Sequence, residues 1–361
     1  MRILIVKLSS LGDVIHCLPS LDALKSGFPE ARIDWLVEEQ NAGILEGHPH
    51  IDHLIILSRK SWMKKPWRII EVFSGIRAFM RDLRSREYDL VIDFQGLFRS
   101  GLLVGLSRGK RKIGFDKVRE MAHLFYNEKV PLSTLNQHAV TRYMEISKYL
   151  NVNPYHLLFF LPISEKEAEY ANKLLEENTI SIIKNKRLIY INPNARWPSK
   201  IWPWERFREL IKTLSLRGYE IVLIGGPDDK DRMDSAFHGI GKSVYNLAGQ
   251  TSLKSLAAIF KKGDCLITND SGPMHLAVAV GLPVIALFGP SNPLRTGPYG
   301  WQNENKQNKV LRSEISCVPC YKKECSHKEC LMNISVDQVL SALDEVLETN
   351  SIKKNLKFKV L

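Results

Sequence analysis

Short apolar runs alternate with longer amphipathic segments along the 361 residues of the chain. The short runs are rich in β-branched side chains, which is typical of strands buried in a parallel sheet. They predict strands at residues 3–6, 33–37, 54–57, 90–94, 111–114, 188–192, 220–225, 265–269 and 283–288. The amphipathic segments predict helices at residues 14–26, 66–83, 139–150, 165–177, 204–216, 227–236, 253–260, 274–280 and 336–348.

This alternation of strand and helix predicts the α/β class. Repeated βα units imply parallel sheets with right-handed crossovers. A polar stretch around residues 177–187 interrupts the pattern, which then restarts with a new apolar run. We therefore expect two domains, residues 1–180 and residues 181–361, each long enough to bury its own core.

The apolar content, 44% of the chain, is that of a globular protein, and no stretch approaches the roughly 18 apolar residues of a membrane span. Lys7 and Asp13 interrupt the first apolar run, and no small-residue cleavage site follows, so a signal peptide is not expected. These features predict a cytosolic protein whose cysteines are reduced.

The formal net charge is +12, and the excess is concentrated in one region. Between Arg59 and Arg142 there are 18 Lys and Arg against 8 Asp and Glu, a difference of ten. Such a region suits nucleic acid, anionic lipid or an acidic substrate, although a solvated surface accounts for many of the individual charges. No helix-turn-helix, zinc-finger helix or aromatic RNA-binding signature accompanies it, so nucleic acid is not an expected partner.

The most informative segment reads Thr-Asn-Asp-Ser-Gly-Pro-Met-His-Leu-Ala, from residue 268 to residue 277. It predicts the end of a strand, a turn with Asp270, Ser271 and Gly272, and a helix with His275 one turn inside. Backbone N–H groups at a helix N-terminus are a natural seat for phosphate. A capped helix, with Asp270 or Ser271 as the N-cap, explains the same residues about equally well.

A second loop of this type follows the first predicted strand and reads Leu-Ser-Ser-Leu-Gly-Asp, from residue 8 to residue 13. Ligands of open α/β sheets bind beyond the carboxyl ends of the strands, where Asp13 would lie. The loop lacks the G-x-G-x-x-G pattern of dinucleotide-binding proteins. Taken alone, it is also explained as a helix cap.

Together these segments resemble glycosyltransferase family 9, the bacterial ADP-heptose:lipopolysaccharide heptosyltransferases, and the N-terminal half is most similar to heptosyltransferase I. The matching stretches follow the family's order: residues 6–14, 93–97, 114–116, 119–120, 137–139, 200–203 and 269–275. The resemblance implies the GT-B fold, in which two Rossmann-like βαβ domains face a central cleft. It also implies that the C-terminal segment, residues 351–361, returns to the first domain.

On the donor side, the resemblance implies an ADP-heptose site. Asp13 matches the family's general base for an inverting transfer, and Lys200 matches the lysine that meets the departing diphosphate. No metal ion is then needed for catalysis. Asp229 matches an acidic ribose contact, although ordinary helix-start acidity explains it about as well. The implied donor-binding residues are Asn194, Lys200, Asp229, Asp270, Ser271, Gly272 and His275.

On the acceptor side, the resemblance implies basic contacts to the carboxylate of Kdo and to the phosphates of lipid A. Trp62, Trp67 and Phe73 lie among these charges, and such a mixture suits peripheral attachment to the cytoplasmic face of the inner membrane. Core packing explains Phe73 at least as well. The implied acceptor-binding residues are Ser10, Arg59, Lys60, Lys64, Arg99, Arg119 and Arg142.

Four cysteines near the C-terminus depart from the heptosyltransferase I pattern and resemble the cysteine-rich tails of heptosyltransferase II and III-like relatives. They are Cys317, Cys320, Cys325 and Cys330. Four thiolates can close a structural tetrahedral Zn²⁺ site, but the spacing is unusual, and unligated thiols are an equally good explanation.

The expected activity is the inverting transfer of L-glycero-D-manno-heptose from ADP-heptose to the Kdo–lipid A inner core. The cysteine-rich tail keeps open an acceptor that already carries heptose, as for heptosyltransferases II and III. A sugar-nucleotide epimerase or hydrolase of the same fold, or a non-catalytic binding protein, remains as an alternative of another class. The basic acceptor region disfavours the former, and the presence of Asp13 and Lys200 disfavours the latter.

Overall fold

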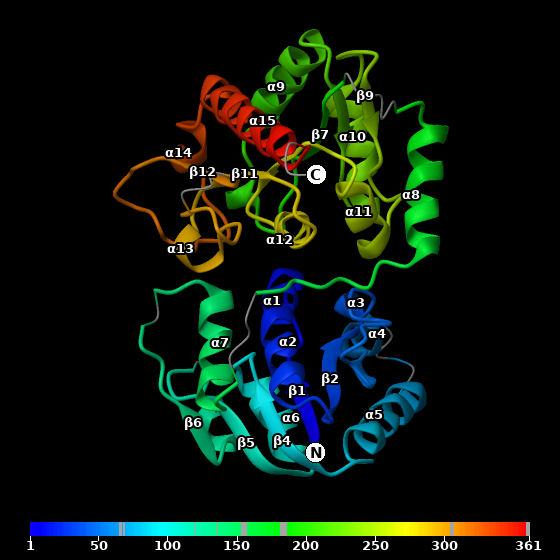
Figure 1. Cartoon of the computed structure of the whole chain (residues 1–361), viewed down its shortest axis with the longest axis vertical. Coiled ribbons are helices and arrows are strands. Elements are labelled where there is room, and N and C mark those ends of the chain that lie inside the picture. The colour runs from blue at the N-terminus through cyan, green and yellow to red at the C-terminus, as the bar shows by residue number, and fades with distance from the viewer. Residues whose placement is uncertain are drawn as a thin grey trace. The chain divides into compact units, whose positions relative to one another are not determined.

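The computed structural model describes residues 1–64, 67, 69–118, 120–134, 136–152, 157–180, 186–303 and 307–358. Contacts divide the chain into two compact units, Met1–Pro162 and Ile163–Leu361 (Figure 1). The division falls before the predicted boundary between residues 180 and 181. The reason is that helix α8 (Glu165–Glu177) packs against α11 (Leu253–Phe260) and so belongs with the second unit.

A six-stranded parallel sheet forms the centre of the first unit. Its strands are β1 (Arg2–Val6), β2 (Arg32–Glu38), β3 (His53–Leu57), β4 (Tyr88–Asp93), β5 (Gly109–Phe115) and β6 (Glu128–Val130), in the order β3-β2-β1-β4-β5-β6. Ile3, Leu4 and Ile5 of β1 are completely buried, as the continuous apolar run predicts. The sequence pattern missed only the edge strand β6, because its residues, Glu-Lys-Val, form no apolar run.

The helices of the first unit differ from the predicted ones in three ways. The helix predicted at residues 14–26 is two helices, because the chain breaks at Cys17, before Pro19 in the first turn of the next helix. The helix predicted at residues 66–83 begins at Ile69. Four short helices were not predicted, at Glu39–Ala42, Arg59–Lys64, Phe98–Leu106 and Ala122–Phe125. The helices are α1 (Leu11–His16), α2 (Leu18–Gly27), α3 (Glu39–Ala42), α4 (Arg59–Lys64), α5 (Ile69–Leu83), α6 (Phe98–Leu106), the 3-10 helix η1 (Ala122–Phe125) and α7 (Ala139–Tyr149).

The second unit contains another six-stranded parallel sheet. Its strands are β7 (Leu188–Asn192), β8 (Glu220–Leu223), β9 (Val244–Asn246), β10 (Cys265–Asn269), β11 (Val284–Phe288) and β12 (Lys309–Arg312), in the order β12-β11-β10-β7-β8-β9. Besides α8 and α11, its helices are η2 (Pro198–Lys200), α9 (Trp204–Leu216), η3 (Pro227–Asp229), α10 (Lys230–Phe237), α12 (Gly272–Ala279), α13 (Pro293–Thr296), α14 (Glu329–Met332) and α15 (Val336–Phe358). The edge strands β9 and β12 were again missed by the pattern.

Helix α15 closes the core of the second unit. It packs on α9 and on the sheet, and the completely buried indole of Trp202 donates a hydrogen bond to the carbonyl of Ile334, just before α15 (3.0 Å). The predicted return of residues 351–361 to the first domain extends beyond the described residues and stays a prediction. In the described part of the chain, no helix is long and apolar enough to cross a membrane.

The two sheets have the same topology. Counted from the start of each unit, the strand order is third, second, first, fourth, fifth, sixth. This is the order of the doubly wound Rossmann fold, whose ligands bind where the order reverses, beyond the carboxyl ends of the first and fourth strands. These switch points lie between β1 and β4 and between β7 and β10, and the loops with Asp13 and Asp270 follow β1 and β10.

Candidate functional site

The first candidate site lies at the switch point between β1 and β4. After β1 the chain turns into α1, with Ser10 as the N-cap and Asp13 as the third helical residue. Asp13 Oδ2 accepts hydrogen bonds from the backbone N–H (3.3 Å) and the hydroxyl (3.0 Å) of Ser10. Asp13 Oδ1 accepts one from the Tyr143 hydroxyl of α7 (2.9 Å). The carboxylate therefore both supports the start of α1 and lies at the sheet edge.

A buried lysine supports this carboxylate. Lys7 Nζ donates to the Tyr143 hydroxyl (2.8 Å) and lies 3.8 Å from Asp13 Oδ1. The Lys7 side chain is 2% exposed, whereas that of Asp13 is 31% exposed. Burial opposes ionisation of Asp13, but Lys7 and the hydrogen bond from Tyr143 lower its pKa to about 2. Burial also opposes the charge on Lys7, but Asp13 and Tyr143 raise its pKa above the usual value. Asp13 is thus an accessible carboxylate kept ionised by a hidden cation.

The loop after β4 completes this switch point. The Asp93 carboxylate is completely buried and accepts hydrogen bonds from the Gln95 backbone N–H (2.8 Å) and the Tyr126 hydroxyl (2.6 Å). It also accepts one from the Ser100 hydroxyl of α6 (2.8 Å). Gln95 Oε1 in turn accepts from the Ser9 backbone N–H (3.2 Å). Asp93 therefore shapes its own loop, and Gln95 ties that loop to the one that carries Asp13.

Basic residues also lie at this sheet edge. Arg59 is exposed and begins α4, directly after β3. Arg99 on α6 pairs with Glu38 at the end of β2 (2.9 Å). Arg142 on α7 donates to the Tyr143 hydroxyl (3.2 Å) and so joins the Asp13 network. Three predicted acceptor residues cannot be placed here: Arg119 and the side chains of Lys60 and Lys64 lie outside the part of the chain that the structure describes.

The second candidate site lies at the switch point between β7 and β10. Asn192 ends β7, and its Nδ2 donates to the hydroxyls of Ser271 (2.7 Å) and Thr268 (3.1 Å). Ser271 precedes α12 at the N-cap position, but within the described residues its side chain makes no capping hydrogen bond. Ser271 is therefore the N-cap residue by position, as one explanation expects, but its hydroxyl turns toward Asn192. The N-terminal end of α12, which begins at Gly272, can receive an anion.

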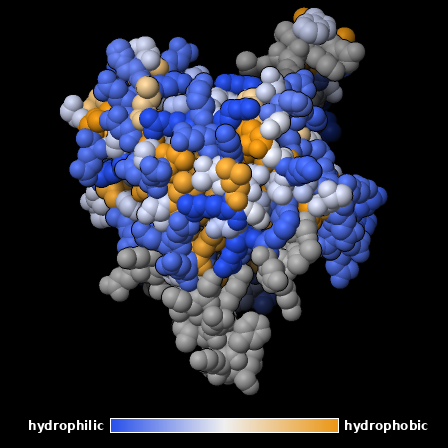
Figure 2. Space-filling view, turned by 90° about the horizontal axis from the view of Figure 1, so that it is seen from above, coloured by the Kyte–Doolittle hydropathy of each residue, from blue (hydrophilic) through white to orange (hydrophobic). Residues whose placement is uncertain are grey.

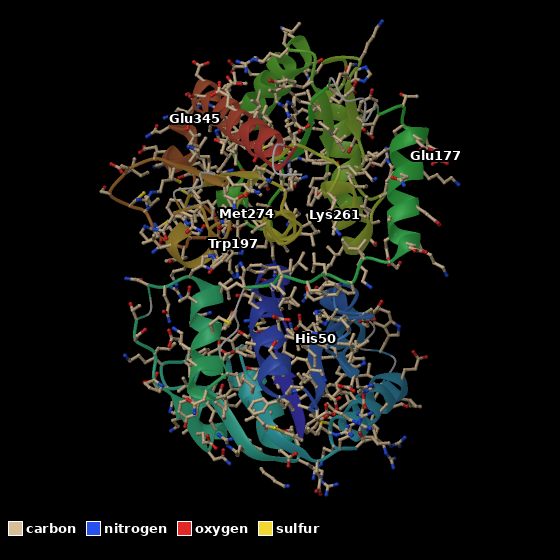
Figure 3. The ribbon with its side chains drawn as sticks, viewed as in Figure 1. His50, Glu177, Trp197, Lys261, Met274 and Glu345 are labelled. Carbon is tan, nitrogen blue, oxygen red and sulfur yellow. The ribbon has the colours of Figure 1, made fainter. Side chains whose placement is uncertain are left out.

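Lys200 provides a cation next to this helix N-terminus. Its Nζ donates to Asp270 Oδ2 (2.5 Å) and lies 4.7 Å from the centre of the Trp197 ring, which Figure 3 labels. The Ser291 hydroxyl also donates to Asp270 Oδ2. The Asp270 side chain is 6% exposed and that of Lys200 is 17% exposed. Asp270 therefore holds the ammonium group of Lys200 at the start of α12.

The remaining predicted donor residues are distributed over three elements. The Asn194 N–H donates to Asn192 Oδ1 in the loop after β7 (3.4 Å), and His275 lies buried on α12. Asp229 Oδ2 accepts a hydrogen bond from the Gly226 N–H (2.8 Å). This bond gives Asp229 the structural role that helix-start acidity suggests, and its ribose contact stays a prediction.

The four C-terminal cysteines differ in exposure. Cys317 and Cys325 are exposed, Cys320 is half-buried and Cys330 is buried. Cys325 Sγ accepts a hydrogen bond from the Lys328 N–H (3.5 Å). Among the residues that the structure describes, no three His, Cys, Asp or Glu side chains are placed to hold a metal ion. A structural Zn²⁺ at this cluster stays a prediction.

Among the network members that the sequence did not assign, three form an ion pair or a hydrogen bond with Asp13 or Asp270: Lys7, Tyr143 and Ser291. Lys7 carried a usable signal, because a lysine that directly follows an apolar strand must find a partner if it is buried. Tyr143 carried none, since it lies 130 residues from Asp13 in the chain. Ser291 was likewise invisible, because only the fold brings it to Asp270.

Two doubly wound parallel-sheet units, each with polar residues at its switch point, form the architecture of the GT-B glycosyltransferases. The family model for glycosyltransferase family 9 (heptosyltransferase) matches residues 76–331, and the chain belongs to this family. The resemblance seen in the sequence is thus confirmed, and the protein is an enzyme that transfers a glycosyl group.

Relatives cover most of the chain. Lipopolysaccharide heptosyltransferase 1 of Pseudomonas aeruginosa is 31% identical over 332 residues, which cover 91% of this chain and 88% of the relative. The enzyme of the same name from Escherichia coli K12 is 32% identical over 305 residues, which cover 83% of this chain and 91% of the relative. The solved structure of E. coli heptosyltransferase WaaC with ADP has a TM-score of 0.76 and 29% identity, and the match covers 96% of this chain and all of that one.

Proposed function

We propose that the protein is an inverting heptosyltransferase that moves L-glycero-D-manno-heptose from ADP-heptose to the Kdo sugar of lipid A, in the synthesis of the lipopolysaccharide inner core. The names of the two relatives support heptosyl transfer to lipopolysaccharide. A solved structure of WaaC with ADP-2-deoxy-2-fluoro heptose, 28% identical with a TM-score of 0.74, supports the donor. The observation that carries the proposal is the ionised Asp13 carboxylate, accessible beside the buried Lys7.

Asp13 is the general base in this proposal. The acceptor hydroxyl donates a hydrogen bond to the carboxylate, and its oxygen attacks the anomeric carbon from the face opposite the diphosphate. The bond between that carbon and the phosphate oxygen breaks, ADP leaves with the electron pair, and Asp13 takes the proton. A carboxylate with a pKa of about 2 is a weak base for a neutral hydroxyl. Proton transfer is therefore late, after the attacking oxygen has acquired positive charge.

The second unit stabilises the leaving group. ADP departs with negative charge on its terminal phosphate, which the Lys200 ammonium and the N-terminal end of α12 can neutralise. The hydrogen bond between Lys200 and Asp270 orients the ammonium group beside this helix N-terminus. Because these groups already supply positive charge, the proposal needs no metal ion.

The acceptor is held by the basic edge of the first unit. Arg59, Arg99 and Arg142 follow or flank the strand ends there, and guanidinium groups bind carboxylates such as that of Kdo bidentately. Lipid A is anchored in a bilayer by its acyl chains. We therefore place the reaction at the cytoplasmic face of the inner membrane, with the protein attached peripherally.

The test is a transfer assay with purified protein, ADP-L-glycero-D-manno-heptose and Kdo2-lipid A, with and without EDTA, read by mass spectrometry. The expected product carries one added heptose, and the yield is unchanged by EDTA. Addition only to an acceptor that already carries heptose would assign the protein to a later transfer step. Donor conversion without transfer would indicate an epimerase or hydrolase, and no reaction with either acceptor would overturn the proposal.

A further inference from the structure

Helix α5 exposes an unusual amount of apolar surface. On the face shown in Figure 2, apolar residues form small areas among hydrophilic ones, as is normal for a globular protein. In α5, at one side of the first unit in Figure 1, Ile69 is 73% exposed, Ile70 is 86% exposed and Phe73 is 66% exposed. Trp67, just before the helix, is 74% exposed. Core packing of Phe73, one of the two expectations from the sequence, is therefore wrong.

The core does not require these side chains. The opposite side of α5 packs against β3, and Phe79 and Leu83 are buried there. The Phe79 ring lies edge-on to the half-buried Trp62 (6.1 Å between centroids). Successive residues of a helix are rotated by roughly 100°. Ile70 therefore lies about 180° and Phe73 about 120° around the helix from Phe79, and α5 has an apolar stripe beyond the one that anchors it.

Cations continue the exposed stripe. Arg77 and Arg81 are exposed and follow Ile70 and Phe73, respectively, by about two helical turns, and the exposed Arg84 follows the helix. At 3.6 residues per turn, the acidic residues of α5 fall on the other side. One of them, Asp82, is already paired with His53 (3.0 Å) and Arg86 (3.1 Å).

We propose that this α5 face, made of Ile69, Ile70, Phe73, Arg77, Arg81 and Arg84, docks on the surface of an anionic phospholipid bilayer. The apolar side chains enter the boundary between headgroups and acyl chains, and the arginines contact lipid phosphates. A second copy of the chain fits this surface less well, because it would bury three arginines, and among the described residues none of the three pairs with an acidic side chain. The surrounding region adds to the attraction, since residues 59–142 carry ten more basic than acidic side chains. The proposal rests on the proposed function only for its purpose, which is to bring the site to a lipid-borne acceptor.

The experiment is flotation of the purified full chain with two kinds of vesicle that contain no lipopolysaccharide. Phosphatidylcholine vesicles and vesicles with added phosphatidylglycerol separate apolar attraction from charge. We expect binding to the anionic vesicles that weakens at high salt. The double variant Ile70→Asp/Phe73→Asp should bind about tenfold more weakly or worse, since two apolar side chains lose their burial. Leu216→Asp is the matched control, because Leu216 is 80% exposed on α9 and should not affect binding.

Three results would overturn the proposal: no binding to anionic vesicles, equal binding by the double variant, or equal binding to both vesicle types at all salt concentrations. Sedimentation of the wild type and the double variant measures their oligomeric states and so tests the alternative occupant, a second copy of the chain. A wild-type dimer that the variant dissociates, without vesicle binding, would assign the face to a second copy. Transfer to a water-soluble Kdo acceptor should be unchanged in the double variant. Failure of the docking and failure of the transfer reaction are therefore read from separate measurements.

Discussion

The two switch points have opposite arrangements of charge on the same strand order. In the first unit the cation is hidden and the anion is accessible, because Lys7 is 2% exposed and Asp13 is 31% exposed. In the second unit the anion is the less exposed partner, because Asp270 is 6% exposed and Lys200 is 17% exposed. One switch point therefore presents a carboxylate and the other presents an ammonium group.

This difference fits the two halves of a glycosyl transfer. An accessible carboxylate can accept the proton of an acceptor hydroxyl, and an accessible ammonium can neutralise a departing diphosphate. In each pair the more buried member orients the more accessible one, and in the first pair Lys7 also lowers the pKa of Asp13. The doubly wound topology supplies the location, and which charge is buried decides whether a carboxylate or an ammonium group is the more accessible one there.

Removing the accessible anion of the first unit should have the largest effect on activity. Asp13→Asn keeps the shape of the side chain but cannot take a proton, so we expect kcat/KM to fall by about 10³-fold. ADP binding, measured by calorimetry, should remain, because the proposed donor contacts lie in the second unit. Activity close to wild type would remove Asp13 as the base.

Removing the accessible cation of the second unit should have the second-largest effect on activity. Lys200→Ala takes away a positive charge at the leaving phosphate, and we expect kcat to fall by about 10²-fold together with weaker ADP binding. Lys200→Arg is the control that keeps the charge and should recover part of the activity. If Lys200→Ala binds ADP and turns over as wild type does, the phosphate role of Lys200 is wrong.

The effect of the buried cation, Lys7, on the pKa of Asp13 can be tested by measuring activity and stability as a function of pH. Lys7→Met removes the charge that lowers the pKa of Asp13, so that pKa should rise and the acidic limb of kcat/KM should move to higher pH. In the wild type the folded-state pKa of Asp13 is depressed. The pair therefore contributes stability above the unfolded pKa, and this contribution disappears as the pH falls toward about 2. Lys7→Met should lose stability at pH 7, measured by urea unfolding, and lose little more on acidification.

Tyr143→Phe is the companion variant for Lys7→Met. It keeps both charges but removes one hydrogen bond to Asp13, so the acidic limb should move in the same direction by a smaller amount. An unchanged acidic limb in both variants would show that Asp13 is not the group that titrates.

The smallest effect is expected from removing the Ser291 hydroxyl, which donates a hydrogen bond to the buried Asp270 carboxylate. Ser291→Ala removes one donor to Asp270 and leaves Lys200 as its partner. A single hydrogen bond contributes about 1 kcal/mol, so we expect a rise of about fivefold in the donor KM with little change in the acceptor KM. A rise in the acceptor KM without a rise in the donor KM would show that Asp270 does not belong to the donor site.

Much of the fold could be predicted because buried parallel strands have a simple signature. The nine predicted strands are all present, whereas β6, β9 and β12 lie at sheet edges and contain little apolar sequence. The two loops of the candidate sites were found for the same reason, since they follow inner strands. The break at Cys17 was not predicted, and the sequence left Phe73 open between the core and an exposed membrane-facing position, because a helical pattern does not show where a helix is interrupted or which apolar residues face the core.

The sequence by itself determined the α/β class, the family and the two loops that carry Asp13 and Asp270, because strand patterns and local motifs depend on neighbouring residues. Only the tertiary structure decided how each charge is held. Tyr143 comes to Asp13 from 130 residues away, and Lys200 and Asp270 meet across 70 residues. The pKa of a carboxylate depends on burial and on charges within a few ångströms, and those distances exist only once the parallel strands bring their carboxyl ends to one edge.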